Sequence, residues 1–283
     1  MILTDSTAAR VQGATVTGIV SVSSTFLQFM QYAAMTVSTA ISGTIGLVKN
    51  GIGGLTLSGV CNYTGPTQIN AGQIAISSAS TLNGVISGAG SLTKTGTTAL
   101  IIGGSNTYSG GTLSAPSAAT GTITFSQNNA FGTGLFTSAG PSQIVCTATS
   151  TLSNDFQINA VQSLQFRVNV ATVILTISGN IAGSGSISKT STGQLRLNGT
   201  LTYTGATTIS AGTLRAIKTT GASTATASFT TGLSVSFNVP PTAGMTFRFF
   251  AGSTTNTYAS VTLVGAPGRT GTYNSSNSTL TIA

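Results

Sequence analysis

A 25-residue segment occurs three times in this chain, and this repetition restricts the possible folds more than any other feature. The copies begin at Ile41, Ile86 and Ile181 and align without gaps. Each has a lysine eight residues after its first isoleucine and a tyrosine fourteen residues after that lysine, which gives Lys49, Lys94 and Lys189, and Tyr63, Tyr108 and Tyr203. Repetition of this kind is typical of proteins that stack structural units into a solenoid.

The spacing and the local pattern of the copies predict how the units stack. The first two copies start 45 residues apart and the third starts 95 residues later, so a degenerate copy is expected around 121–173. Apolar residues alternate with polar ones, as at Leu100 and Ile102, which predicts short strands with one buried face. With coils of roughly 20–25 residues, each unit fits about two coils. Parallel pairing at about 4.8 Å then gives a rod on the order of 50 Å long, with glycines such as Gly43, Gly88 and Gly183 at its corners.

Composition indicates a folded but almost uncharged molecule. Only 4% of the residues are charged, against about a quarter in an ordinary soluble domain, so Ser, Thr, Asn and Gln must hydrate the surface. No run of 18 apolar residues predicts a membrane-spanning helix. The net charge of +8 arises from ten basic and two acidic residues, and the basic residues are dispersed. We therefore predict no nucleic-acid partner, because phosphate binding needs clustered cations.

Two cysteines and the start of the chain bear on its cellular compartment. Cys61 and Cys146 exclude a disulfide framework, leave one bridge open, and are predicted to be two buried free thiols. The first ten residues lack the pattern of a secretory signal, and a weaker candidate at 19–40 is interrupted by polar residues. From the initiator methionine we expect release in the cytosol.

Several segments resemble the autotransporter-associated β-strand repeat of bacterial surface proteins. The resemblance rests on the blocks at 91–111 and 186–214, on NNAFGTG at 128–134 with TLSNDFQIN at 151–159, and on the C-terminal segment at 246–265. It implies a right-handed parallel β-helix with a surface or adhesive role. The sequence lacks strands of about ten alternating residues, so we do not expect it to contain a membrane barrel. The second copy also departs from the pattern, since Leu113 to Pro116 replace the T-x-I-x-A-G motif at 67–72 and 207–212.

The two ends lack the repeat and are predicted to cap the stack, whose strand edges would otherwise be open. We divide the chain into a cap or assembly segment at 1–40, β-helix repeats at 41–218 and a β cap at 219–283. The first segment contains a bulky cluster that forms either a short helix or a strand and is a candidate assembly contact: Phe26, Leu27, Phe29, Met30, Tyr32 and Met35. In the last segment, strands are predicted at 233–237, 245–250, 260–264 and 279–282.

The residues needed for catalysis are scarce. The chain has no histidine, and its carboxylates are Asp5 and Asp155, so a facing pair for glycoside hydrolysis is not expected. Asp155 is interpreted as a turn residue. We predict no enzymatic activity, metal or cofactor.

The repeated lysines and tyrosines are the remaining candidates. Equal repeat positions would place Lys49, Lys94 and Lys189 as a ladder on one face of the rod. The ladder is interpreted as solvated charges that discourage lateral strand association, or alternatively as a row that binds acidic glycans. The three tyrosines are interpreted as stacked packing residues.

Two functions are compatible with these observations. The first is a structural subunit of a virus or phage particle, such as a fibre, spike or capsid decoration, that assembles as a homo-oligomer on the virion surface. The second is a bacterial surface adhesin or extracellular filament subunit of the autotransporter-passenger type, with a glycan or other cell-surface ligand.

Overall fold

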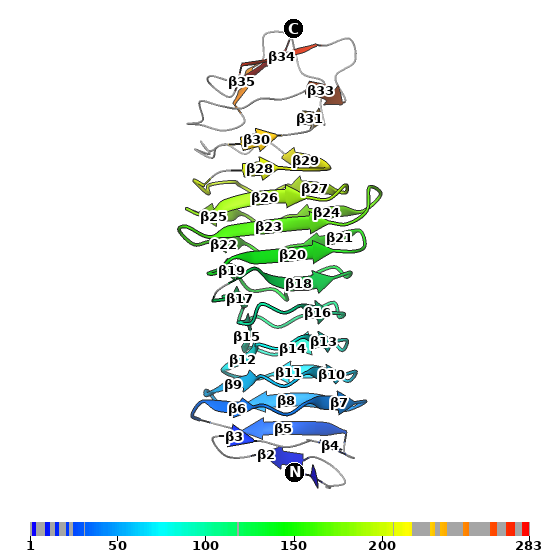
Figure 1. Cartoon of the computed structure of the whole chain (residues 1–283), viewed down its shortest axis with the longest axis vertical. Helices are drawn as coiled ribbons and strands as arrows, with labels where there is room; N and C mark the ends of the chain where they lie inside the picture. The colour runs from blue at the N-terminus through cyan, green and yellow to red at the C-terminus, as the bar shows by residue number, and fades with distance from the viewer. Residues whose placement is uncertain are drawn as a thin grey trace.

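The computed structural model describes most of the repeat region and short pieces of both ends. The described residues are 2–3, 9–11, 15–16, 21–22, 25–30, 32–117, 119–205, 207–216, 227–229, 233–236, 246–248, 261–264, 270–274 and 279–282. All regular elements among them are β-strands, which stack as a solenoid of about 9 turns with the two termini at opposite ends (Figure 1). The prediction of an all-β parallel solenoid is confirmed.

Each coil passes through three sides, and the strands of one side pair in parallel with those of the coils above and below. Side 1 begins with the five-stranded sheet of β2 (Ala9–Val11), β5 (Phe26–Met30), β8 (Gly46–Asn50), β11 (Thr67–Ile69) and β14 (Ile86–Ser87). It continues as the four-stranded sheet of β21 (Ser150–Leu152), β24 (Ile174–Ile177), β27 (Gln194–Leu197) and β29 (Thr213–Ala216). Backbone hydrogen bonds of Asn106 and Asn129 bridge the interval between these two sheets.

Side 2 is one continuous sheet of nine strands. It contains β3 (Thr15–Val16), β6 (Met35–Val37), β9 (Gly54–Leu57), β12 (Gln73–Ile76), β15 (Ser91–Lys94), β17 (Thr112–Ser114), β19 (Phe136–Ser138), β22 (Phe156–Ile158) and β25 (Ile181–Gly183). With one strand in each coil, this sheet follows the rod along most of its length.

Side 3 consists of a short sheet and a longer one that contact each other between β10 and β13. The short sheet contains β7 (Ile41–Gly43) and β10 (Cys61–Tyr63). The eight-stranded sheet contains β13 (Ser80–Leu82), β16 (Leu100–Ile102), β18 (Gly121–Phe125), β20 (Ser142–Cys146), β23 (Ser163–Val168), β26 (Ser186–Thr190), β28 (Thr207–Ile209) and β30 (Ala227–Phe229). At the N-terminal end, β4 (Ser21–Val22) contacts β7 and pairs with β1 (Ile2–Leu3).

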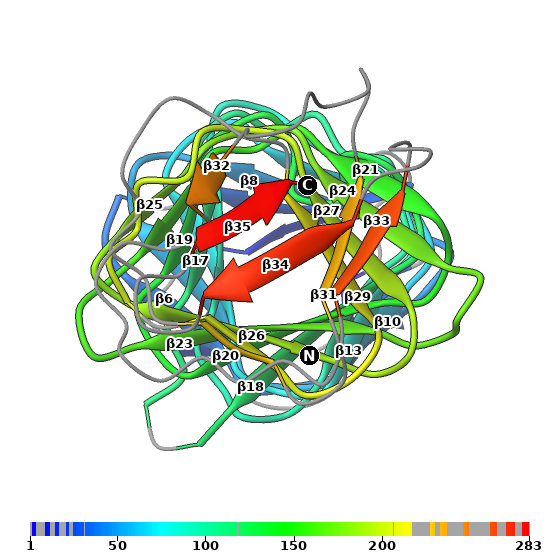
Figure 2. The same ribbon diagram turned by 90° about the horizontal axis from the view of Figure 1, so that it is seen from above.

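The coil is right-handed, as expected. Seen from above, with the C-terminal end toward the reader, the chain runs anticlockwise from β25 through β26 to β27 (Figure 2). Coils of 20 residues occur where positions 27, 47 and 67 pair in turn, and a coil of 25 residues occurs where Phe156 pairs with Ile181. These lengths agree with the range predicted from the repeat.

The repeat spacing is not a whole number of coils. Ile41, which begins the first copy, pairs with Cys61 on side 3, whereas Ile86, which begins the second copy, pairs with Thr67 on side 1. The 45-residue spacing therefore equals two coils plus one side, so equivalent residues of the first two copies lie on different sides of the rod.

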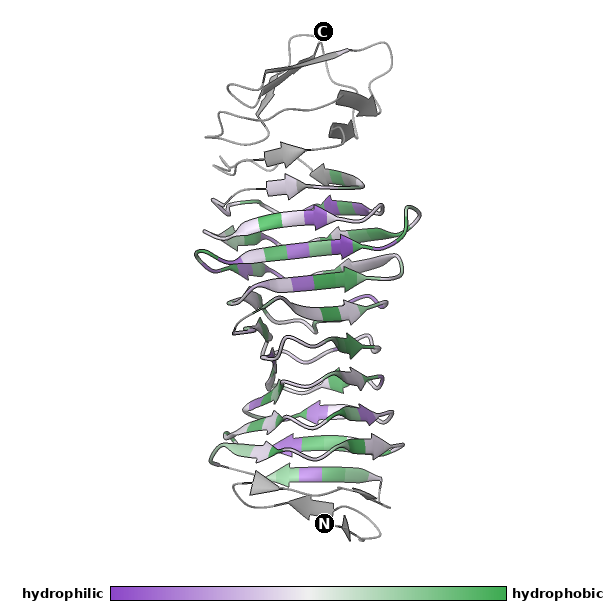
Figure 3. Cartoon of the chain, in the orientation of Figure 1, coloured by the Kyte–Doolittle hydropathy of each residue, from purple (hydrophilic) through white to green (hydrophobic). Residues whose placement is uncertain are grey.

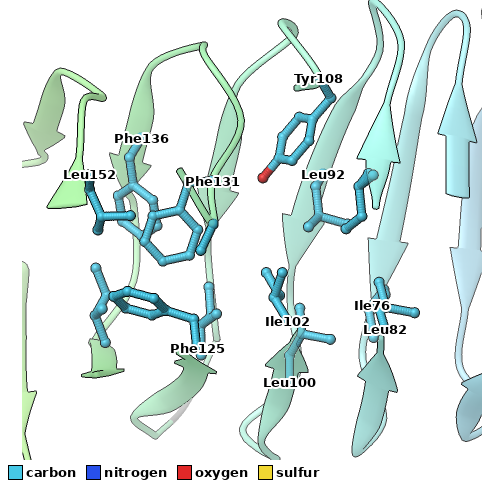
Figure 4. Close-up of a cluster of buried hydrophobic side chains, with 14 of the residues drawn as sticks. Ile76, Leu82, Leu92, Leu100, Ile102, Tyr108, Phe125, Phe131, Phe136 and Leu152 are labelled. Atoms are coloured by element: carbon cyan, nitrogen blue, oxygen red, sulfur yellow. The ribbon is translucent and has the colours of Figure 1, made fainter. Parts of the chain in front are cut away.

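Alternation along the strands places one set of side chains inside the coil, as the pattern predicts. Hydrophobic and hydrophilic residues alternate along several of the strands (Figure 3). In the middle coils the interior is filled by stacked rings, with centroid distances of 4.8 Å for Phe131 and Phe136 and 5.0 Å for Phe136 and Phe156. Figure 4 shows part of this stack beside the aliphatic residues of the earlier coils. Tilted and edge contacts at such distances are favourable for aromatic rings.

Glycine is required at the corner that opens each copy. Gly183 has a φ of +110°, and a Cβ at this residue would lie 2.0 Å from the carbonyl oxygen of Ile158 in the coil below. Gly43 and Gly88 have φ of +105° and +103°. Other residues adopt this region of φ only at a substantial cost, so the sharp corner and the close stacking of coils both depend on the glycine.

Strands extend into both predicted end segments. In the first, β5 and β6 pair in register with β8 and β9, so the bulky cluster forms strands rather than a helix, except for Tyr32, which lies in the bend between them. In the last, the four predicted strands are confirmed by β31 (Leu233–Ser236), β32 (Thr246–Arg248), β33 (Val261–Val264) and β35 (Thr279–Ile282). There β31 pairs with β33, and β32, β35 and β34 (Gly271–Asn274) form an antiparallel sheet, unlike the parallel coils.

Candidate functional site

The repeated lysines do not form a surface ladder, and that prediction is wrong. Lys49, Lys94 and Lys189 lie on β8, β15 and β26, which belong to sides 1, 2 and 3. Each side chain is 0% exposed. The cause is the alternation itself, because each lysine is two residues after an inward apolar residue and therefore also points inward: Leu47, Leu92 and Ile187. This signal was present in the sequence.

Lys49 and Lys189 reach a corner of the coil, where their ammonium groups bind backbone carbonyl oxygens. Lys49 Nζ donates to Asn50 at 3.1 Å, to Gly51 at 2.7 Å and to Ala71 at 3.1 Å. Lys189 Nζ repeats the arrangement with Thr190 at 2.8 Å, Ser191 at 2.6 Å and Ala211 at 3.2 Å. The third acceptor comes from the corner of the next coil, so each lysine links two coils. An ammonium group has three donors, and all three are used.

Lys94 occupies the same position in the second copy but has fewer partners. Its ammonium group donates to the carbonyl oxygen of Gly96 at 2.5 Å, and this is the one acceptor that the described structure gives it. The residue 22 positions after Lys94 is Pro116, whereas the other copies have Ala71 and Ala211. The lost T-x-I-x-A-G motif therefore coincides with the lost carbonyl acceptor.

The three ammonium groups are buried without an acidic partner. Among the described residues the only carboxylate side chain is that of Asp155, whose Oδ1 accepts the backbone N–H of Asn180 at 2.7 Å. Burial lowers the pKa of Lys94 and of Lys189 to about 8 and also lowers the pKa of Lys49. At Lys49 and Lys189, three carbonyl oxygens therefore solvate the charge in place of water or a counter-ion.

The repeated tyrosines are packing residues, as predicted. Each is at most 1% exposed, and its hydroxyl bonds the threonine four residues later. The oxygen separations are 2.7 Å for Tyr63 and Thr67, 2.5 Å for Tyr108 and Thr112, and 2.5 Å for Tyr203 and Thr207. Because these tyrosines are inside the coil, they cannot offer a platform for a carbohydrate.

The N-terminal bulky cluster divides into two groups. Leu27, Phe29 and Met35 are buried in the core and cannot contact another molecule, so this part of the assembly prediction is wrong. Phe26 is half-buried. Met30 and Tyr32 remain candidates, since they are 36% and 77% exposed. A homo-oligomer through these two residues stays a prediction.

The other candidates are accounted for as follows. Cys61 and Cys146 are free and buried, as predicted, and burial raises the pKa of both thiols to about 11. The role of Asp155 in a turn agrees with its backbone bond, whereas Asp5 lies outside the described residues.

Within the described residues there is no group of three or more His, Cys, Asp or Glu side chains that could hold a metal ion. The same residues contain no helix long and apolar enough to span a membrane.

Comparison with known families identifies the lysine corners as part of a recognised repeat. The family model of the passenger-associated transport repeat matches residues 47–76, 92–113 and 187–216. Each match includes one buried lysine and one buried tyrosine, and the shorter second match ends just before the segment with Pro116. Searches of curated proteins and of solved structures give no match. The three matches and the stacked coils together fit an autotransporter-passenger-like β-helix repeat protein.

Proposed function

We propose that this chain is a passenger-type rod that serves a structural or adhesive role at the bacterial cell surface. The observation that carries the proposal is the coincidence of the matched repeats with the lysine corners of an uninterrupted solenoid. Passenger-associated repeats belong to proteins presented at the cell surface or outside the cell. The virus-particle interpretation has no comparable support.

A rod built in this way is suited to presenting a surface to other molecules rather than to catalysis. Apart from the three corner lysines, the described inward positions are occupied mainly by packing residues. The outward positions on side 3 are mainly uncharged polar residues such as Thr122, Gln143 and Gln165, which are half-buried in their ladder. Such a surface is hydrated without strong charge. In the proposed role the protein acts as a non-catalytic spacer, and specificity for a glycan or a cell-surface protein belongs to its exposed corners.

Surface display tests the proposal directly. The chain is placed between a cleavable secretory signal and the translocator of an autotransporter, and display on intact cells is measured by antibody binding and by release with external protease. The proposal predicts display of a folded, protease-resistant rod. Retention inside the cell of a chain that folds when purified would contradict it.

A matched pair of variants separates a failure of folding from a failure of export. Gly183→Ala places a Cβ against the coil below, whereas Gly54→Ala meets no atom within 4 Å. We expect Gly54→Ala to be displayed like the parent chain and Gly183→Ala to be displayed less and cleaved faster. Equal display of both variants would show that the stacked coil is not what is presented.

A further inference from the structure

The interior above Lys94 differs from that above the other two corner lysines. In the parallel ladders, Lys49 lies directly below Ile69 and Lys189 below Ile209, whereas Lys94 lies below Ser114. The next residue in the Lys94 column is also a serine, Ser138. Serine has two fewer side-chain heavy atoms than isoleucine, so it leaves room beside the Lys94 stem that an isoleucine would fill.

Lys94 also has fewer backbone carbonyl acceptors than the other two corner lysines. Lys94 Nζ donates to one carbonyl oxygen, that of Gly96, where each of the other two lysines donates to three. Lys94 is 0% exposed, so bulk water does not reach its two remaining N–H donors. Leaving such donors unpaired in the interior is costly, and more so when the group is charged.

The neighbouring hydroxyl groups can accept as well as donate. Ser142 Oγ donates to the carbonyl oxygen of Gly140 at 2.8 Å, and Ser142 Oγ and Ser114 Oγ are 2.8 Å apart. Ser142 Oγ is the donor in its contact with Ser114 Oγ as well, so the hydrogen of Ser114 Oγ is not used there. Ser114 Oγ can therefore donate to a further acceptor, and Ser114 is 0% exposed.

We infer that an ordered water molecule is bound inside this corner, where it accepts hydrogen bonds from Lys94 Nζ and from Ser114 Oγ. Water fits both requirements, because its two lone pairs can accept one hydrogen from the ammonium group and one from the hydroxyl. The site is polar, has the extra room and offers the two or more partners that buried water needs. In this proposal the lysine corner of the second copy is hydrated, whereas in the first and third copies backbone carbonyl groups occupy all three donors of the lysine.

A crystal structure of the full chain grown in sodium bromide tests the site, with data collected at the bromine absorption edge. We expect a peak about 2.7–3.2 Å from both Lys94 Nζ and Ser114 Oγ, without anomalous signal. Lys49 and Lys189 are internal controls, and no such peak is expected at either ammonium group. Absence of a peak at Lys94, or an anomalous peak of bromide there, would overturn the inference.

Two variants of the same residue give a second test in the same crystals. Ser114→Ile restores the residue that the other copies have above the lysine, and it should displace the water. Ser114→Ala enlarges the site slightly but removes the hydroxyl partner, so the peak should persist with higher mobility. A peak unchanged in Ser114→Ile would place the water elsewhere and contradict the proposed geometry.

Discussion

Replacing the corner lysines by methionine tests how much the carbonyl contacts contribute to stability. Lys49→Met and Lys94→Met both keep an unbranched stem and remove a fully buried ammonium group. Loss of a desolvated charge favours both variants, and it favours Lys94→Met more, because burial lowers the pKa of Lys94 to about 8. The carbonyl contacts act in the same direction, since Lys49→Met leaves three carbonyl oxygens without their donor, whereas Lys94→Met leaves one.

The size of this difference follows from the two additional carbonyl groups. A buried acceptor that loses its partner costs about 1–3 kcal/mol, which gives about 2–6 kcal/mol for two. Asn50, Gly51 and Ala71 are half-buried, so water recovers part of the loss. We therefore expect the lower end, about 2 kcal/mol more destabilisation for Lys49→Met.

Hydrogen exchange of individual amides measures this effect locally, which matters because repeat proteins need not unfold in one step. The amide of Asn70 donates to the carbonyl oxygen of Lys49, and the amide of Ala115 donates to that of Lys94. Protection at Asn70 in Lys49→Met should fall roughly 30-fold more than protection at Ala115 in Lys94→Met, since 1.36 kcal/mol is tenfold. Equal losses, or a larger loss at Ala115, would refute the role assigned to the carbonyl contacts.

Three further predictions concern the pH dependence, the corners and the core. Stability should rise from about pH 8, because the unfolded chain then binds more protons than the folded one, whose corner lysines have pKa values of about 8. Stability should fall above about pH 10, because burial raises the pKa values of the thiols and tyrosines and the folded state then keeps protons that the unfolded chain loses. Urea melts at pH 7, 9 and 11 measure both the rise and the fall in stability. Gly183→Ala should lower the thermal midpoint well below that of Gly54→Ala in matched calorimetric scans, and equal midpoints would deny the strain at the corner. Phe136→Ala should cost about 3–5 kcal/mol in urea unfolding, and a loss under 1 kcal/mol would contradict its place between two rings.

The strands were predictable from the sequence, because alternation between turn residues determines them locally. The orientation of the lysines followed from the same alternation, since Leu92 and Lys94 share one face, yet the general rule that charged residues lie outside led to the opposite interpretation. What the rule leaves out is that a corner supplies three carbonyl oxygens, enough to replace the hydration of an ammonium group.

The distribution of the repeats around the rod was not predictable from their spacing alone. Equal positions in a repeat share a side only when the spacing is a whole number of coils, and the 45-residue spacing exceeds two coils by one side. The number of residues in a coil depends on the length of its corners, for example the long corner that contains Pro116. These corner lengths become known only when the coils are stacked in the structure. The hydrated corner depends on the same detail, because it combines residues from three successive coils.

Distances between spin labels along side 2 test the stack of parallel coils most directly. One register column contains Thr56, Ala75, Thr93, Leu113, Thr137, Gln157 and Ala182. The four label sites Thr56, Thr137, Gln157 and Ala182 are half-buried. With both native cysteines replaced by alanine, labels at Thr56 and at Thr137, Gln157 or Ala182 are separated by four, five or six coils. The account predicts backbone separations of about 19, 24 and 29 Å, increasing by one strand spacing at each step. Distances that do not increase in this order, or that jump by more than one strand spacing between neighbouring positions, would contradict it.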